Sequence, residues 1–427
     1  MSTSRLRKSA EALVALAFLV AASGAQPVRA GGAGSGQQPQ PQRLGSPDAE
    51  ATSALLEGDG ERTRFRLVLS RGVTAEIYTL ANPYRVVIDL PGVLFRLPAG
   101  TGQSGEGLVS AFRYGLFAEG RARIVLDTTA PVRIGRAAMA KPETSASDMS
   151  LDVELVRTSP ESFGSGTGAG RPHPAPAARP PEPKERETQR GGKPVVLIDP
   201  GHGGIDGGAV SPSGQTEKSV VLSVARALGE TLAKRGRYEI RFTRQTDVFV
   251  SLDRRLAISR EVGAELFISL HADAIAATGL AQSIRGATVY TLSGKVSDEE
   301  ARRMAEKENA SDLLAGADIA TDEEAGDVKG ILIDLLKRET ANFSTDFSNV
   351  VVRRLGKAIP LARDPQRSAA FKVLRQTHAP SVLIELGYLS HTEDQKLMGT
   401  TEWQRRVAGA IADAVDAYFA KRTANTP

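Results

Sequence analysis

Hydrophobic and polar positions alternate in the first part of the chain. The alternation is clearest over residues 65–69, 84–90 and 149–155, and Asn-Pro, Pro-Gly and glycine-rich turns separate such runs. A period of two residues is typical of strands that bury one face. We therefore predict a small all-β domain over residues 61–156.

Beyond residue 194 short apolar runs alternate with helical patterns. The expected strands are 195–199, 239–243, 266–270, 287–292 and 382–385, and the expected helices are 218–235, 251–262 and 402–420. This alternation predicts an α/β fold with a mostly parallel sheet covered by helices, over residues 194–421. Ligands of such sheets bind beyond the carboxyl ends of the strands.

Three segments lack the pattern of a folded core. One indicates a signal for export, and the other two indicate flexible linkers. Basic Arg5, Arg7 and Lys8 precede an apolar run at 12–22, so residues 1–30 are expected to be a signal peptide that directs the protein to the periplasm. The apolar run is shorter than the roughly 20 residues that span a membrane, and the alternative is an uncleaved interfacial anchor. Glycine- and proline-rich composition predicts flexible linkers at 31–60 and 157–193.

Composition narrows the class of protein. Hydrophobic residues make up 41% and charged residues 24% of the chain, which favours folded globular domains over a disordered polymer. The net charge of +4 is too small for this length to indicate nucleic-acid binding. There is no cysteine, which excludes disulfides and thiolate metal sites.

Four polar residues fall where the predicted sheet would place a site. His202 follows the first strand, His271 and Glu385 end later strands, and Glu217 opens the first helix. Two imidazoles and one carboxylate can make a three-ligand zinc set with one open position, although another divalent metal would also fit. A histidine at a strand end can equally be an ordinary hydrogen-bonded residue.

Glu217 lies on the apolar stripe of its helix. Steps of three or four residues lead from it to Val221, Val224 and Leu228, which should face the sheet. Burial of a carboxylate on that face would destabilise the fold by roughly several kcal/mol unless the carboxylate were paired or bound to a metal. The alternative is a first-turn glutamate stabilised by the helix dipole.

The C-terminal part resembles the zinc-dependent N-acetylmuramoyl-L-alanine amidases of bacterial cell division. The resemblance runs through residues 195–206, 266–273 and 381–390 and the helix that Glu217 opens. It implies that His202, Glu217 and His271 ligate Zn²⁺. It also implies that Glu385 is the catalytic carboxylate. The preceding β domain is similar to a peptidoglycan-targeting domain, most clearly in its strand at 123–127.

A charged helical segment, residues 296–359, interrupts the catalytic pattern as an insertion. The resemblance implies that it carries an autoinhibitory helix with a glutamate as fourth zinc ligand. In the run Ala305-Glu-Lys-Glu-Asn-Ala310 we expect this ligand to be Glu308, with Glu306 next. The alternative is that both are solvated helix charges.

A second part of the insertion has an apolar stripe. It consists of Val328, Ile331, Leu332, Leu335 and Leu336. Such a stripe either packs on its own protein or forms a docking face. For the docking alternative, the resemblance implies an activator that is a degraded, metallopeptidase-like protein of the division machinery.

We therefore expect a periplasmic peptidoglycan hydrolase that acts in cell-wall remodelling and daughter-cell separation. It would cleave the amide bond between N-acetylmuramic acid and the L-alanine of the stem peptide. Peptidoglycan and an activator are its expected partners, without nucleic acid or a stable membrane span. The alternatives are a non-catalytic wall-binding regulator and a zinc peptidase that cuts within the stem peptide.

Overall fold

The computed structural model describes most of the chain in six stretches. These are residues 49–142, 148–163, 192–275, 284–316, 330–376 and 378–424, with only the backbone for 330–337. The expected signal peptide and most of the expected 157–193 linker lie outside them. Within these stretches no helix is long and apolar enough to cross a membrane.

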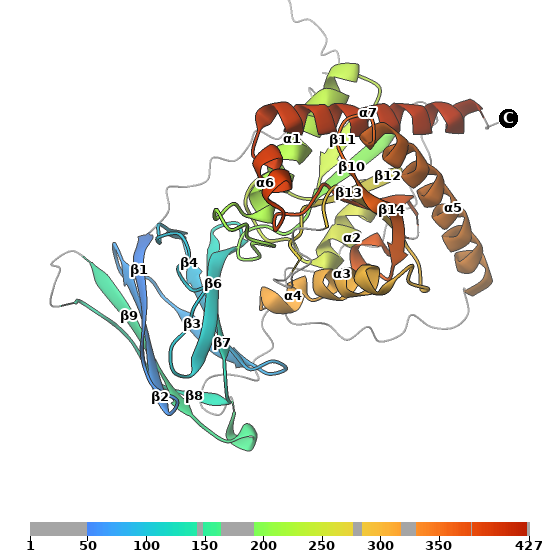
Figure 1. The fold of residues 1–427 in the computed structure, drawn as a ribbon. Helices are drawn as coiled ribbons and strands as arrows, with labels where there is room; N and C mark the ends of the chain where they lie inside the picture. Colours follow the sequence, from blue (N-terminus) through green and yellow to red (C-terminus); the bar gives the residue numbers. More distant parts are fainter. Residues whose placement is uncertain are drawn as a thin grey trace, which may run out of the picture. The chain divides into compact units, whose positions relative to one another are not determined.

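The N-terminal region is all-β, as predicted, and consists of two sheets (Figure 1). One has the order β5 (Val93–Phe95), β1 (Ala49–Gly58), β2 (Arg62–Leu69), β9 (Met149–Arg157) and β8 (Val132–Ala140). The other has the order β3 (Glu76–Leu80), β4 (Arg85–Pro91), β7 (Arg121–Thr128) and β6 (Val109–Ala118). Alternate residues of both sheets, such as Phe65, Leu67 and Ile88, form one buried core. A short 3-10 helix, η1 (Pro160–Ser162), follows β9.

Two details of this region differ from the prediction. β1 lies in the segment expected to be a flexible linker, residues 31–60, because small alanines form much of its buried face and give a weak hydrophobic signal. β4 is buried on both faces instead of one. Asp89 of β4 is accommodated because Arg123 donates two hydrogen bonds to its carboxylate, at 2.6 and 2.8 Å.

The C-terminal region has the expected α/β fold. Its sheet has the order β11 (Glu239–Phe242), β10 (Val195–Pro200), β12 (Leu266–His271), β15 (Ser381–Glu385), β13 (Ala287–Leu292) and β14 (Leu361–Ala369). Neighbouring strands are parallel except for the β13–β15 pair. The sequence pattern predicted all of these strands but β14. β14 lies at the sheet edge and is largely polar.

Helices cover both faces of this sheet (Figure 1). The core of one face includes residues of α1 (Glu217–Arg235), α5 (Gly330–Leu355) and α7 (Thr401–Ala424), and α6 (Thr392–Met398) precedes α7. The core of the other face includes residues of α2 (Leu252–Glu261), α3 (Glu299–Asn309) and the 3-10 helix η2 (Lys372–Leu374). The predicted helices at 218–235, 251–262 and 402–420 correspond to α1, α2 and α7.

The segment expected to be an insertion, residues 296–359, is not one structural piece. Its first part forms α3 and the short α4 (Ser311–Leu314). The second half of α5 belongs to the main core, where Phe347, Val351 and Leu355 are fully buried. The expected docking stripe, Val328 to Leu336, lies outside the described side chains. Among the described parts of this segment, α3 and α4 contribute no residue to that main core, although α3 packs on the other face of the sheet.

Candidate metal centre

His202 lies in the loop that follows β10. Its backbone has a φ of 57°, a left-handed conformation that costs a non-glycine residue of order 1–3 kcal/mol. Arg255 holds this conformation by donating a hydrogen bond to the His202 carbonyl at 2.8 Å. The neighbouring Gly201 has no space for a side chain, since an added Cβ would lie 2.4 Å from the His271 ring. The loop therefore brings the two imidazoles close together.

His271 and Glu385 end neighbouring parallel strands. They are paired residues in the register of β12 and β15, so their side chains lie at the same edge of the sheet. His271 is 5% exposed and Glu385 is fully buried. The backbone N–H of Asp273 donates to Glu385 Oε2 at 3.1 Å. Glu385 Oε1 has no hydrogen-bond partner among the described residues.

Glu217 is the first residue of α1 and is fully buried, on the face that carries Val221 and Val224. Its Oε2 accepts a hydrogen bond from the Ala209 N–H at 2.9 Å. Its Oε1 accepts from the Ala272 N–H at 2.8 Å. The carboxylate is thus held from both sides by backbone donors, which fixes its orientation toward the histidines.

Glu308 enters the same site from α3. It is 5% exposed, because Ala301, Met304 and Ala305 place this side of the helix against the domain. Glu306, the other candidate, lies on the outer side with a side chain 61% exposed and pairs with Arg302. Of the two glutamates, Glu308 is the one at the site.

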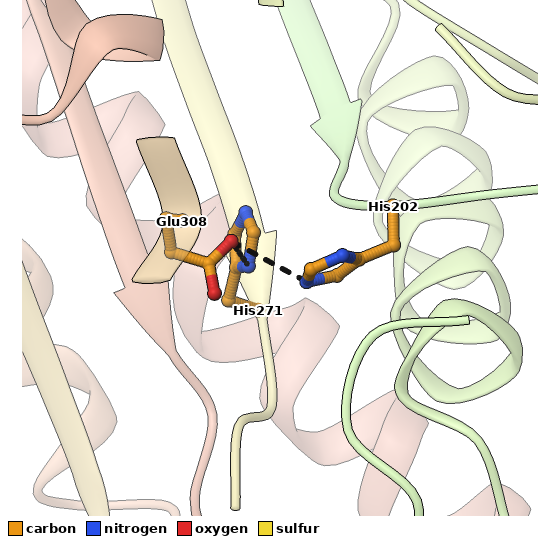
Figure 2. Close-up of side chains that lie close together, drawn as sticks. All are labelled: His202, His271 and Glu308. Carbon is orange, nitrogen blue, oxygen red and sulfur yellow. Dashed lines mark ion pairs between the residues drawn. The ribbon is translucent and has the colours of Figure 1, made fainter. Parts of the chain in front are cut away.

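Four side-chain atoms from four separate elements meet at this point. His202 Nε2 lies 3.2 Å from Glu217 Oε1 and 3.4 Å from Glu308 Oε2. His271 Nδ1 lies 3.1 Å from Glu217 Oε1 and 3.2 Å from Glu308 Oε2. Figure 2 shows Glu308 and the two histidines pointing toward one another.

These four separations are compatible with neighbouring ligands of one metal ion, and the ligand atoms of His202, His271 and Glu308 all lie within 4.8 Å of one another. Zinc binds imidazole nitrogen and carboxylate oxygen at about 2.0–2.2 Å, which places neighbouring ligand atoms of a tetrahedron about 3.3–3.6 Å apart. His202 Nε2 is buried and makes no hydrogen bond with the described residues, although two glutamate oxygens lie close to it. Its lone pair is therefore available to an ion between the four side chains.

The charge of the site also favours a cation. Burial acts to lower the pKa of His202, but the carboxylates of Asp206, Glu217 and Glu308 together raise it well above its usual range. Burial raises the pKa of Glu385 well above its usual range, and the carboxylates of Glu217 and Asp273 raise it further. So many buried carboxylates need compensating positive charge.

Several residues that support the site were not predicted from the sequence. Asp206 Oδ2 lies 2.9 Å from His202 Nδ1 and so holds the ring with Nε2 toward Glu217 and Glu308. Arg244 donates to the Gly201 carbonyl at 2.8 Å and, with Arg255, holds the loop. Arg255 lies one turn after Leu252 on the buried side of α2, and an arginine on that side is a signal that the sequence did contain.

Comparison with known proteins identifies two families along the chain. Residues 196–417 match the Amidase_3 family, described as N-acetylmuramoyl-L-alanine amidase, and residues 56–145 match the AMIN domain. The first match covers the region that holds all four candidate residues.

Two individual relatives by sequence give the same result. The amidase AmiA of Escherichia coli is 36% identical over 237 residues, which are 55% of this chain and 80% of that protein. The amidase AmiC of Neisseria meningitidis is 36% identical over 232 residues, 54% of each chain. Among solved structures, the catalytic domain of the amidase CwlV from Paenibacillus polymyxa is 25% identical with a TM-score of 0.37. That similarity covers 53% of this chain and 98% of that domain.

Proposed function

Since the chain belongs to the N-acetylmuramoyl-L-alanine amidases and is therefore a peptidoglycan hydrolase, we propose how its residues perform that reaction. His202, Glu217 and His271 hold a catalytic Zn²⁺, and Glu385 is the general base. The observation that carries this proposal is that Glu217 Oε1 lies 3.2 Å from His202 Nε2 and 3.1 Å from His271 Nδ1. Glu385 lies beside them at the end of the next strand.

The reaction adds water to the amide between the lactyl group of N-acetylmuramic acid and the L-alanine nitrogen. His202, Glu217 and His271 would hold a zinc ion there, and the ion would supply Lewis-acid chemistry, which polarises the scissile carbonyl and lowers the pKa of the attacking water towards about 7. Glu385 takes a proton from the water and passes it to the nitrogen as the C–N bond breaks. The products are a lactyl carboxylate and a stem peptide with a free amine.

Glu385 is suited to this role by its surroundings. Its Oε2 is fixed by the Asp273 N–H at 3.1 Å, whereas its buried Oε1 has no partner among the described residues. One oxygen is thus held in place and the other is available to a water molecule. Full burial excludes bulk solvent, so a proton taken by Glu385 is kept for the leaving nitrogen.

We also propose that α3 is an autoinhibitory element. Glu308 Oε2 takes the position of a fourth ligand, 3.4 and 3.2 Å from the two histidine nitrogens. Glu308, Asn309 and Ser311 line the same pocket as His202 and His271. A substrate carbonyl needs that position, so hydrolysis requires α3 to move. A division-associated activator that docks on the inserted helices would displace α3 from the site.

The wider setting follows from the rest of the chain. The basic and apolar pattern of residues 1–30 supports export to the periplasm. The all-β region, predicted as residues 61–156 and matched to the AMIN domain over 56–145, would hold the enzyme on the wall. In that compartment the amidase would remodel peptidoglycan and separate daughter cells.

Digestion of purified sacculi by the full-length protein tests the proposal. The expected products are stem peptides with a free L-alanine amine and glycan without peptide, identified by mass spectrometry. Their release should stop on zinc chelation and should be faster with Glu308→Gln. Cuts inside the stem would indicate a peptidase instead, and no release by either protein would indicate a wall-binding regulator.

A further inference from the structure

Two neighbouring residues of α3 enter the site, and they carry opposite charges. Glu308 approaches the two histidines, as described above. Lys307 extends beside it, and its ammonium group pairs with Asp273 Oδ1. The helix therefore presents a carboxylate and an ammonium side by side.

Asp273 is buried in a part of the molecule that is rich in negative charge. Its side chain is 2% exposed, whereas that of Lys307 is 45% exposed. Glu217, Glu308 and Glu385 are buried in the same site. A buried carboxylate among others is costly unless a cation or several donors compensate it. Its Oδ1 also accepts from the Ala274 N–H at 2.6 Å, but that donor is neutral. When α3 leaves, Asp273 loses its cationic partner.

Asp273 also lies close to the reacting groups. It comes two residues after His271, and its own N–H orients Glu385. Glu385 delivers a proton to the nitrogen of the scissile amide in the proposed reaction. A carboxylate next to that base lies where the released amine, which is an ammonium at neutral pH, needs an acceptor.

Resting on the proposed function, we propose that Asp273 is the subsite for the amine side of the scissile bond. It accepts a hydrogen bond from the L-alanine nitrogen as the C–N bond breaks and then holds the ammonium of the stem peptide. Hydrolysis of an amide by one water gives one carboxylate and one ammonium. Glu308 and Lys307 present this same pair of groups, so α3 closes the site as a mimic of both products.

The simpler alternative is that the ion pair between Lys307 and Asp273 only stabilises α3 in its closed position. The two interpretations make different predictions for the enzyme with α3 displaced. If Asp273 serves only as a fastener, then it has no ligand in the open enzyme. If it is a subsite, then it recognises a free amine there, and an acetylated amine should not replace it.

The test uses the full-length protein with α3 displaced by Lys307→Ala and Glu308→Ala together. The probe is a synthetic stem tripeptide that begins with L-alanine, with a free or an acetylated amine, and its affinity is measured by calorimetry. We expect Asp273→Asn in this background to lower the affinity for the free-amine peptide about 10- to 100-fold, which corresponds to the free energy of a hydrogen bond to a charged group. The acetylated peptide should bind weakly and equally to both proteins.

Equal affinity of the free-amine peptide for both proteins would overturn the proposal and leave Asp273 as a fastener. Zinc content and the unfolding midpoint of each variant are measured alongside. If Asp273→Asn does not fold, then Asp273→Ala, which also lacks the charge, replaces it, and the same weakening of free-amine peptide binding is expected. Release of peptides from sacculi by the open background is followed separately. If that release is absent, then the proposed function fails, whatever the peptide affinities show.

Discussion

Two helices each bring one glutamate oxygen to the same pair of imidazoles, and they hold it in different ways. Glu217 begins α1, whose buried side consists of valines and leucines, and both of its oxygens accept hydrogen bonds from backbone N–H groups. Glu308 lies near the end of α3, whose buried side is mainly alanine and one methionine. Its Oε1 has no partner among the described residues.

The packing of the two helices indicates which glutamate belongs to the site permanently. Burial of a valine or leucine side chain stabilises by about 1.5–3 kcal/mol, and an alanine contributes much less. α1 therefore cannot leave without disrupting the core, whereas α3 can leave at moderate cost. The outer side of α3 also carries charged, exposed residues such as Arg303 and Glu306. We interpret Glu217 as a fixed ligand and Glu308 as an exchangeable one.

Removal of the metal should have the largest effect. Without zinc, hydrolysis of sacculi should stop, and the stabilisation of about 4 kcal/mol that a ligand gives at about 1,000 times its Kd should be lost. For a region of this size the unfolding midpoint should fall by about 8–16 °C in calorimetry. Zinc added back should restore both values. An unchanged midpoint together with unchanged hydrolysis would contradict the metal site.

Glu385→Gln should separate metal binding from chemistry. The variant keeps Glu217, Glu308 and both histidines, so its zinc content should match that of the unaltered protein. Loss of a general base typically lowers kcat about 10²- to 10⁴-fold. Peptide release and zinc content are measured on the same sample. Full activity of this variant would remove Glu385 from the mechanism.

Glu308→Gln should loosen α3 and leave α1 unchanged. A charge-assisted contact contributes about 1.5–3 kcal/mol, so amides of α3 should exchange with deuterium about 10- to 100-fold faster. Glu306→Gln is the matched control on the same helix. Its surface ion pair is worth at most about 1 kcal/mol, and exchange should change little. Equal effects of the two substitutions would show that Glu308 does not hold the helix.

Asp206→Asn should have a smaller effect on the metal alone. The amide oxygen can still accept from His202 Nδ1, but it lacks the charge that makes the imidazole a better ligand. Loss of such a supporting carboxylate should lower zinc affinity about tenfold. Competition with a chromophoric chelator measures this. An affinity equal to that of the unaltered protein would show that the loop alone orients His202.

Much of this arrangement could be predicted from the sequence, because it rests on regular elements. The strands that end at His271 and Glu385 and the helix that begins at Glu217 were all expected. β14 was missed because an edge strand has one paired neighbour and tolerates polar residues. Asp206 was missed because it lies in an irregular loop, where no period indicates which side chains meet.

The spacing of apolar residues in α3 would have distinguished Glu308 from Glu306 in the sequence alone. Ala301, Met304 and Ala305 define the buried side of α3, and the next step of three or four residues leads to Glu308. Glu306 lies off that side. The roles of the site residues, in contrast, came from the family resemblance, since spacing alone does not distinguish a ligand from a buried ion pair.

Matched substitutions of the two glutamates distinguish a fixed ligand from an exchangeable one. Full-length Glu217→Gln and Glu308→Gln proteins are compared in one assay, for zinc content and for release of stem peptides with a free L-alanine amine from sacculi. We predict opposite results: Glu217→Gln loses zinc and activity, whereas Glu308→Gln keeps zinc and releases peptides faster than the unaltered protein. Loss of zinc and activity in both variants, or unchanged release with Glu308→Gln, would contradict the distinction between a fixed and an exchangeable ligand.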